Sequence, residues 1–248
     1  MIMTNILKKL IRTYGIENLI VVWDGGRSGR DVIDSQYKAG RIPAGKLWQD
    51  IVFMARLIEH LGITSAMAPG YEADDAIASL ATQIDEPIRI YSNDRDFYQL
   101  VNDRIMVLKP GKGKEENLSI DTKVVEEITG YPPEKLVLVK SFKGDVSDNI
   151  QKLPIRFTGK FKTGFNQTVL VSKDVEHFYQ QMDPFFEDNA KTALLAFKDR
   201  AIINQSLLKM MRDLEVAVEQ TPADLAKANA LVAECSTYKI DLDFFRQT

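Results

Sequence analysis

The sequence has little of what secreted, zinc-binding and membrane proteins are built from. Its single cysteine, Cys235, cannot form an internal disulfide, which argues against an oxidising compartment. Its two histidines, His60 and His177, are far apart and have no cysteine at metal-ligand spacing, which argues against zinc. No apolar run approaches the roughly 20 residues that cross a bilayer, and the charged, periodic start is unlike a secretory signal. We therefore expect a cytoplasmic protein.

The chain does have enough apolar sequence for substantial cores. Of its 248 residues, 45% are hydrophobic, which suffices for one large domain or two smaller ones. The formal net charge of −3 gives no direct sign of a nucleic-acid partner. Many of the acids, however, are concentrated in a few motifs, and the remainder of the chain is mildly basic. A basic surface around an acidic centre would suit a phosphodiester substrate.

Periodicity predicts alternating strands and helices in the first half of the chain and helices in the second. Strands are expected at residues 19–23, which form a continuous apolar run, and at 63–68, 88–91 and 105–108, and residues 118–120 could form an edge strand. Amphipathic helices are expected at the start of the chain as far as Gly15, and over 47–61, 73–83, 122–129, 133–142, most of 185–219 and 223–235. No strand is expected after Asp121. We place a boundary near residue 120, with an α/β core at 1–120 and a helical portion at 121–248.

Acidic side chains gather in the stretch GYEADDAIASLATQIDEPIRIYSNDRD, residues 70–96. The acids of this stretch are Glu72, Asp74, Asp75, Asp94 and Asp96. The first three lie at a helix start, and the last two follow the carboxyl end of a strand, where open α/β sheets place their active crevice. Carboxylates gathered closely repel one another unless a cation neutralises them, which indicates a site for hard divalent metals. Helix caps and turns are the alternative explanation for each group.

Three further acids and a basic segment fit the same site. Asp24 ends an apolar run, and Asp145 and Asp148 are three residues apart between two predicted helices, although each also suits a turn or a cap. The segment RSGRDVIDSQYKAGR, residues 27–41, is polar and basic. Its phosphate-binding candidates are Arg27, Arg30, Lys38 and Arg41, and Tyr37 could stack on a base. A solvated surface segment is the alternative.

Five motifs in order resemble the flap endonuclease superfamily, most closely the bacteriophage 5′-exonucleases and the 5′-nuclease domain of DNA polymerase I. They are VVWDGG at 21–26, YKAGR at 37–41, GYEADDAIASLA at 70–81, SNDRDFYQLV at 92–101 and GDVSDNI at 144–150. The resemblance implies a PIN-like, mostly parallel sheet flanked by helices. It also implies two Mg²⁺ or Mn²⁺ ions bound by Asp24, Glu72, Asp74, Asp75, Asp94, Asp96, Asp145 and Asp148. Lys38 and Arg41 would contact the scissile phosphate, with Tyr37 at a base-stacking position beside them.

The chain departs from the family pattern in two places. Family members begin with a strand that ends in an Asp, and this chain starts inside the helix that should follow it. After Ile150 the run QKLPIRFTGKFKTGF lacks the tight glycine spacing of the family's helix-hairpin-helix, so we expect a degenerate motif without a bound potassium ion. Its cations remain candidate phosphate contacts: Lys152, Arg156, Lys160 and Lys162.

The sequence therefore predicts a 5′-3′ exonuclease and structure-specific 5′-flap endonuclease that hydrolyses DNA, or an RNA primer, during replication, as in a bacteriophage. The expected partners are DNA with a 5′ flap or free 5′ end, RNA–DNA hybrids and replication proteins, with no membrane partner and a monomeric state. Two alternatives stay open. One is a branched-DNA-binding homologue with impaired catalysis, and the other is a PIN-like ribonuclease.

Overall fold

The chain is divided into two compact units, each built from separated stretches of sequence. The computed structural model describes residues 2–40, 45–111, 115–235, 240 and 242–246. The first unit comprises Met1–Gly26, Ile42–Ala76 and Leu214–Thr248, and the second comprises Arg27–Arg41 and Ile77–Asp213. Helix α4 (Ala73–Gln83) has its first turn in the first unit and its remainder in the second. The boundary predicted near residue 120 falls inside the second unit.

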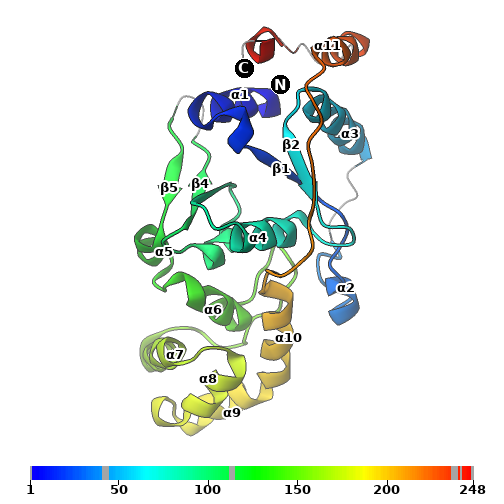
Figure 1. Ribbon diagram of the computed structural model, residues 1–248. Helices are drawn as coiled ribbons and strands as arrows, with labels where there is room; N and C mark the ends of the chain where they lie inside the picture. Colours follow the sequence, from blue (N-terminus) through cyan, green and yellow to red (C-terminus); the bar gives the residue numbers. More distant parts are fainter. Residues whose placement is uncertain (1, 41–44, 112–114, 236–239, 241, 247–248) are drawn as a thin grey trace. The chain divides into compact units, whose positions relative to one another are not determined.

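A three-stranded mixed sheet lies within the first unit (Figure 1). Strand β1 (Ile20–Trp23) is parallel to β2 (Thr64–Met67), and β2 is antiparallel to β6 (Ala217–Glu219). The other elements of this unit are α1 (Ile2–Tyr14), η1 (Ile16–Asn18), α3 (Gly45–His60), α11 (Leu225–Glu234) and η5 (Asp243–Arg246). Apolar residues of α1, α3 and α11 form one buried cluster, which explains the amphipathic pattern of these helices.

Strand β6 corrects the expectation that strands end at Asp121. Its three residues are all exposed and carry no alternating apolar pattern, so no periodicity marks them as a strand. They are held by backbone pairing instead, with Ala66 opposite Val218 in the register of the ladder. A strand that depends on main-chain hydrogen bonds to a distant partner leaves little trace in its own side chains.

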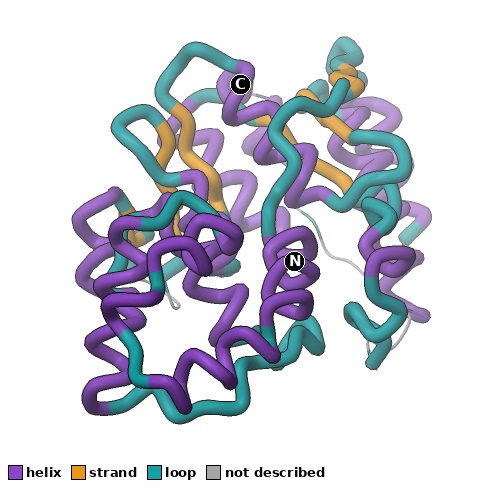
Figure 2. Tube along the Cα trace, turned by 90° about the horizontal axis from the view of Figure 1, so that it is seen from below, coloured by secondary structure: helices purple, strands orange, loops and turns teal. Residues whose placement is uncertain are grey.

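The second unit contains the other three-stranded sheet and most of the helices. Strand β3 (Ile88–Tyr91) is parallel to β4 (Ile105–Lys109), and β4 is antiparallel to β5 (Leu118–Ile120). The remaining elements are α2 (Arg30–Ile33), η2 (Arg95–Leu100), α5 (Thr122–Thr129), η3 (Pro133–Lys135), α6 (Leu136–Lys143), α7 (Gly159–Val171), α8 (Val175–Gln181), η4 (Asp183–Phe185), α9 (Asp188–Ala196) and α10 (Lys198–Leu208). Helices are coloured purple in Figure 2, and they dominate the chain after β5.

Aromatic rings form the centre of the helical part of the second unit. The ring centroid of Phe142 on α6 lies 4.5 Å from that of Phe178 on α8 and 5.5 Å from that of Phe165 on α7, and all three rings are fully buried. This packing fixes α6, which carries a residue of the candidate site described below.

The predicted α/β class is confirmed, whereas the single mostly parallel sheet is replaced by two small mixed sheets. In each sheet of the described residues, one pair of strands is parallel and the other antiparallel. Strand lengths of three to five residues leave little periodicity from which pairing could be predicted. The described residues include no helix that is both long enough and apolar enough to span a bilayer.

Candidate active site

The eight predicted acidic ligands are divided equally between the two units. Asp24, Glu72, Asp74 and Asp75 belong to the first unit, and Asp94, Asp96, Asp145 and Asp148 to the second. Each set is therefore described within its own unit. In both units the acids lie after the carboxyl end of a strand, at a helix start or in a tight turn, as the sequence predicts.

In the first unit, Asp24 joins the end of β1 to the start of α4. Its carboxylate Oδ1 accepts a hydrogen bond from the backbone N–H of Ala73 at 2.7 Å, so Asp24 satisfies a donor in the first turn of α4. The next residue allows this close approach, because a Cβ on Gly25 would stand 2.1 Å from the carbonyl oxygen of Ala68. Asp75, in the first turn of α4, is fully buried.

In the second unit, Asp94 and Asp96 form a turn at the end of β3. The Oδ1 atom of Asp94 accepts a hydrogen bond from the backbone N–H of Asp96 at 2.8 Å, and Asp94 N–H donates to Ser92 Oγ at 3.0 Å. Asp94 thereby caps η2. Gln99 anchors η2 to the end of α10, since its side chain donates to the Leu208 carbonyl and accepts from the Met210 N–H, both at 3.1 Å.

The motif GDVSDNI forms a tight loop closed by an antiparallel bridge between Asp145 and Ile150. Their backbone N–H and carbonyl groups exchange hydrogen bonds of 3.0 and 2.7 Å. The side chain of Asp145 is fixed inside the loop, where its Oδ1 accepts from the N–H and the hydroxyl of Ser147 at 2.8 and 2.6 Å. Asp148 is buried, and its carbonyl accepts from the Lys38 N–H at 3.1 Å.

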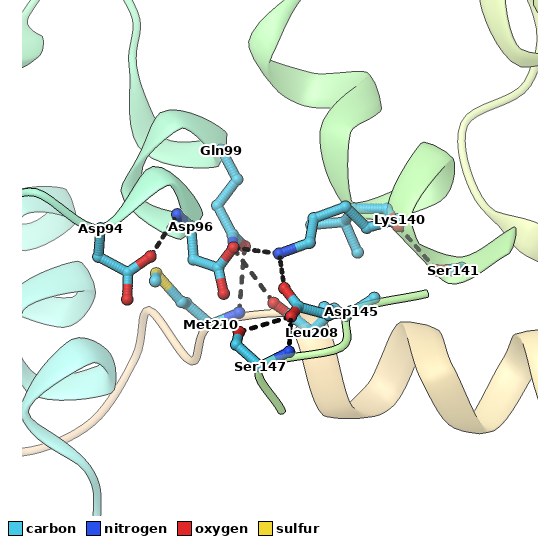
Figure 3. Close-up of polar contacts among 10 residues, drawn as sticks. Asp94, Asp96, Gln99, Lys140, Ser141, Asp145, Ser147, Leu208 and Met210 are labelled. Atoms are coloured by element: carbon cyan, nitrogen blue, oxygen red, sulfur yellow. Dashed lines mark hydrogen bonds and ion pairs between the residues drawn. The ribbon is translucent and has the colours of Figure 1, made fainter. Parts of the chain in front are cut away.

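Lys140 connects the two acidic turns of the second unit. Its ammonium forms an ion pair with Asp96 Oδ1 and a second, at 2.6 Å, with Asp145 Oδ2. Figure 3 shows the Lys140 nitrogen between the two carboxylates, which come from η2 and from the loop after α6. Two predicted ligands that are 49 residues apart in sequence therefore converge on one cation.

The ionisation of these groups follows from their burial and their mutual contacts. Burial raises the pKa of Asp96, and the attraction of Lys140 offsets this only in part. Burial also opposes ionisation of Asp145, but the hydrogen bonds from Lys140 and Ser147 outweigh it and hold the pKa of Asp145 at about 2. Burial would lower the pKa of Lys140, yet the two carboxylates raise it above its ordinary value. Lys140 is therefore protonated and positively charged at neutral pH.

A cavity of about 440 Å³ lies in the second unit beside this ion-pair cluster. Its lining includes Asp94, Asp96, Lys140, Asp145, Ser147 and Asp148, together with Tyr98 and Tyr131. Within the described ranges, no group of three or more His, Cys, Asp or Glu side chains is arranged to hold a metal ion. The carboxylates that do converge here, those of Asp96 and Asp145, converge on a lysine.

The predicted basic segment of residues 27–41 contains both exposed and buried side chains. Arg27 is exposed and pairs with Asp31 at 3.9 Å. Arg30 is only 5% exposed, and its guanidinium donates to the carbonyls of Leu207 and Lys209 at 2.9 and 3.2 Å, at the end of α10. Two of its partners are thus backbone oxygens, and contact with phosphate stays a prediction.

Tyr37 and Lys38 lie next to the GDVSDNI loop. Tyr37 is 8% exposed and packs in a cluster with Ile150, Leu207 and Leu208, so its ring is mostly covered by protein. The Lys38 ammonium lies 4.8 Å from the centroid of that ring, and the Lys38 backbone has a positive φ of 51°. Base stacking by Tyr37 stays a prediction. Arg41 lies outside the described residues.

The four cations predicted to contact phosphates after Ile150 are all exposed. Lys152 and Arg156 lie in the loop before α7, and Lys160 and Lys162 lie in its first turn. Lys160 pairs with Glu187 at 3.0 Å, although both side chains are more than three quarters exposed. These cations are accessible to a polyanion, as a phosphate contact would require.

Sequence reasoning missed Lys140, the residue at the centre of the site. A signal was present, because Lys140 interrupts the apolar run LVLVKSF, and a charged residue within a mostly buried helix usually has a partner. The sequence also gave no sign of Arg200, which pairs with Asp34 at 2.6 Å and so fixes the turn that leads to Tyr37 and Lys38.

Comparison with known proteins identifies the relatives of this chain. The family described as "5'-3' exonuclease, N-terminal resolvase-like domain" matches residues 1–130. The 5'-3' exonuclease of Buchnera aphidicola subsp. Schizaphis graminum is 28% identical over 237 residues, which cover 90% of this chain and 78% of that protein. The thermostable DNA polymerase I of Thermus filiformis is 29% identical over 213 residues, which cover 81% of this chain. The chain spans only about a quarter of that polymerase.

A solved structure shows the same fold. The bacteriophage T5 D15 flap endonuclease, in a pseudo-enzyme-product complex with DNA and metal ions, superposes with a TM-score of 0.62 and 18% identity, covering 98% of this chain and 86% of that one. The family match extends over more than half of the present chain and includes the acidic motifs up to Asp96. The chain therefore belongs to the 5′-3′ exonuclease and flap endonuclease superfamily.

Proposed function

We propose that this protein is a metal-dependent 5′-3′ exonuclease and 5′-flap endonuclease that hydrolyses phosphodiester bonds of DNA, or of an RNA primer, during replication. One observation carries the proposal. In a chain of this family, the carboxylates of Asp96 and Asp145 reach the same cation from separate loops, beside a cavity. A pair of carboxylates held this close is costly to maintain unless a positive charge lies between them.

The donor chemistry of the site fits Mg²⁺ or Mn²⁺, which prefer carboxylate oxygens. We propose that Asp94, Asp96, Asp145 and Asp148 hold metal from the second unit, and that Asp24, Glu72, Asp74 and Asp75 do so from the first. Two bound divalent ions would lower the pKa of a coordinated water and neutralise charge that develops on the phosphate. The T5 D15 flap endonuclease was solved with metal ions, which supports a metal cofactor in this chain but does not say which metal.

The basic residues of the chain would bind and orient the substrate. We assign Lys38 and Arg41 to electrostatic stabilisation of the scissile phosphate, which requires charge but no proton transfer. Arg27, Lys152, Arg156, Lys160 and Lys162 would contact phosphates along the strand. The exposure of the last four supports that role. Arg30 and Tyr37 would serve chiefly to fix the segment that carries Lys38, given their burial.

The proposal is tested by incubating the purified chain with Mn²⁺ and a 5′-flap duplex, a nicked duplex or an RNA-primed duplex. We expect 5′-end products and loss of cleavage on chelation. The variant Asp145→Asn should lose at least about a hundredfold in rate, since it removes an anionic ligand and the partner of Lys140. Asp103→Asn is the matched control, because Asp103 is an exposed acid in the turn before β4 and outside the site.

The outcomes separate the alternatives. Metal-dependent cleavage that Asp145→Asn abolishes and Asp103→Asn retains supports the proposal. If all three proteins show no cleavage on any of the duplexes, the proposal fails. A purely DNA-binding protein is the second candidate, favoured by the absence of a ready group of three metal-ligating side chains in the described part of the chain. It would bind branched DNA with an affinity that falls steeply as salt rises, without turnover.

A further inference from the structure

We propose that Lys140 is an internal cation that occupies part of the metal site, and that divalent metal binds by displacing its ammonium from between Asp96 and Asp145. This inference rests on the proposed function, because it concerns how the same site is loaded. It makes Lys140 a competitor of the metal and therefore a determinant of metal affinity.

The first observation is that Lys140 bridges the two carboxylates without a metal, although its single charge balances only one of them. Lys140 Nζ contacts Asp96 Oδ1 and lies 2.6 Å from Asp145 Oδ2. The other oxygen of Asp145 is taken by two donors of Ser147. Across the described residues, no buried side-chain nitrogen or oxygen atom lacks a hydrogen-bond partner. The protein thus supplies its own counter-charge where the carboxylates would otherwise repel each other.

The second observation is that the ammonium and a divalent ion would require the same oxygens. A hard divalent cation binds carboxylate oxygens at about 2.0–2.6 Å. The Lys140 nitrogen already lies at a comparable distance from Asp145 Oδ2, so a metal bound to both carboxylates would meet a like charge in contact with it. The two cations therefore exclude one another. This competition accounts for the finding that these acids form no ready metal-ligating group among the residues described.

The third observation is that Lys140 has room to leave. Its side chain is 29% exposed, and it lines the 440 Å³ cavity, so the four-carbon stem can turn without disturbing the buried face of α6. The backbone of Asp145 is held independently by its bridge to Ile150. Displacement of the ammonium would leave the carboxylates in place. The free-energy cost of metal binding would then be limited to breaking the two ion pairs of Lys140.

Competition of this kind has a measurable consequence. The apparent Kd for the metal is the intrinsic Kd divided by the fraction of molecules in which the ammonium has left the site. Replacing Lys140 with methionine removes the competitor and nearly keeps the length of the side chain. We expect Lys140→Met to bind Mn²⁺ about tenfold more tightly than the unaltered chain. In the absence of metal, the same variant should unfold at a lower temperature, because Asp96 and Asp145 lose their shared cation. Mn²⁺ should raise the unfolding midpoint of this variant by more than it raises that of the unaltered chain.

The experiment is a titration of the full chain with Mn²⁺ after treatment with chelator, followed by calorimetry or by the electron paramagnetic resonance signal of free Mn²⁺. Lys140→Arg keeps a cation and should leave the Kd near that of the unaltered chain. Lys143→Met is the matched control on the same helix. The Lys143 ammonium lies over the rings of Tyr131 and Phe157 at 4.9 and 5.8 Å, so its removal should not change metal affinity. Lys140→Gln provides a second neutral variant, should Lys140→Met fail to fold.

Tighter Mn²⁺ binding by the neutral variants alone supports the proposal. Unchanged or weaker binding by both neutral variants overturns it, because Lys140 would then hold the acids for the metal or take no part in binding. Cleavage by the unaltered chain would leave the proposed function standing in that case. If the unaltered chain neither binds Mn²⁺ nor cleaves DNA, both proposals fail.

Discussion

Gly144 begins the GDVSDNI loop. We predict that replacing it distorts the loop that holds Asp145, although no acidic residue of the site is changed. Gly144 has φ 69° and ψ −179°, a backbone conformation that is essentially restricted to glycine. A Cβ at this position would also stand 2.6 Å from the Ile150 carbonyl oxygen and 2.8 Å from the Lys152 N–H nitrogen. Both atoms belong to the backbone, so they cannot move aside as a flexible side chain could.

The magnitude follows from two contributions. The backbone conformation alone costs about 1–3 kcal/mol for a residue with a Cβ. The overlap with Ile150 must in addition displace the strand-like bridge that holds Asp145. We therefore expect Gly144→Ala to lower the free energy of unfolding by about 3 kcal/mol or more. This is a large share of the roughly 5–15 kcal/mol typical of a domain, although the chain should still fold.

Gly130 offers a matched control. It has φ 78° and ψ 11° at the end of α5, and no heavy atom lies within 4 Å of the place where its Cβ would be. Gly130→Ala should cost only about 1 kcal/mol, the ordinary penalty for a left-handed residue. Urea denaturation of both variants, followed by circular dichroism, measures the difference. A loss for Gly144→Ala no greater than that for Gly130→Ala would refute the reasoning, since the overlap would then contribute nothing.

Three further predictions follow from the polar contacts of single side chains. Arg104→Met should lower the free energy of unfolding by about 2 kcal/mol in urea denaturation, because the guanidinium satisfies carbonyls at the end of α4, including that of Ala81 at 2.9 Å. Asn204→Leu should cost about 2–4 kcal/mol in the same assay, since the buried amide donates to the Ser141 and Gln151 carbonyls at 2.8 and 2.7 Å. The low pKa of Asp145 should stabilise the fold above pH 4, and that contribution should be lost as the pH falls towards 2. Comparing unfolding midpoints of the unaltered chain and Asp145→Asn tests this, and a parallel decline in both proteins would contradict it.

The sequence by itself determined the order of the elements and the positions of the acids along them. Apolar runs predicted β1 to β4, and amphipathic spacing predicted α1, α3 and α4, because both patterns are local consequences of burying one face of an element. Local chemistry also located Asp24, Asp94 and Asp145 at element ends. The five ordered motifs were enough to indicate the family, which the family match then confirmed.

Tertiary structure decided which residues meet. Lys140 and Asp96 are 44 residues apart, and no local pattern connects a lysine in an apolar helix to a carboxylate in another turn. Arg30 reads as a surface cation in a polar segment, yet it donates to the end of α10, which lies 177 residues later in the sequence. Strand β6 likewise exists only through its pairing with β2. Periodicity reports how a residue relates to its neighbours in sequence, whereas ion pairs and strand pairing depend on groups brought together when distant segments pack.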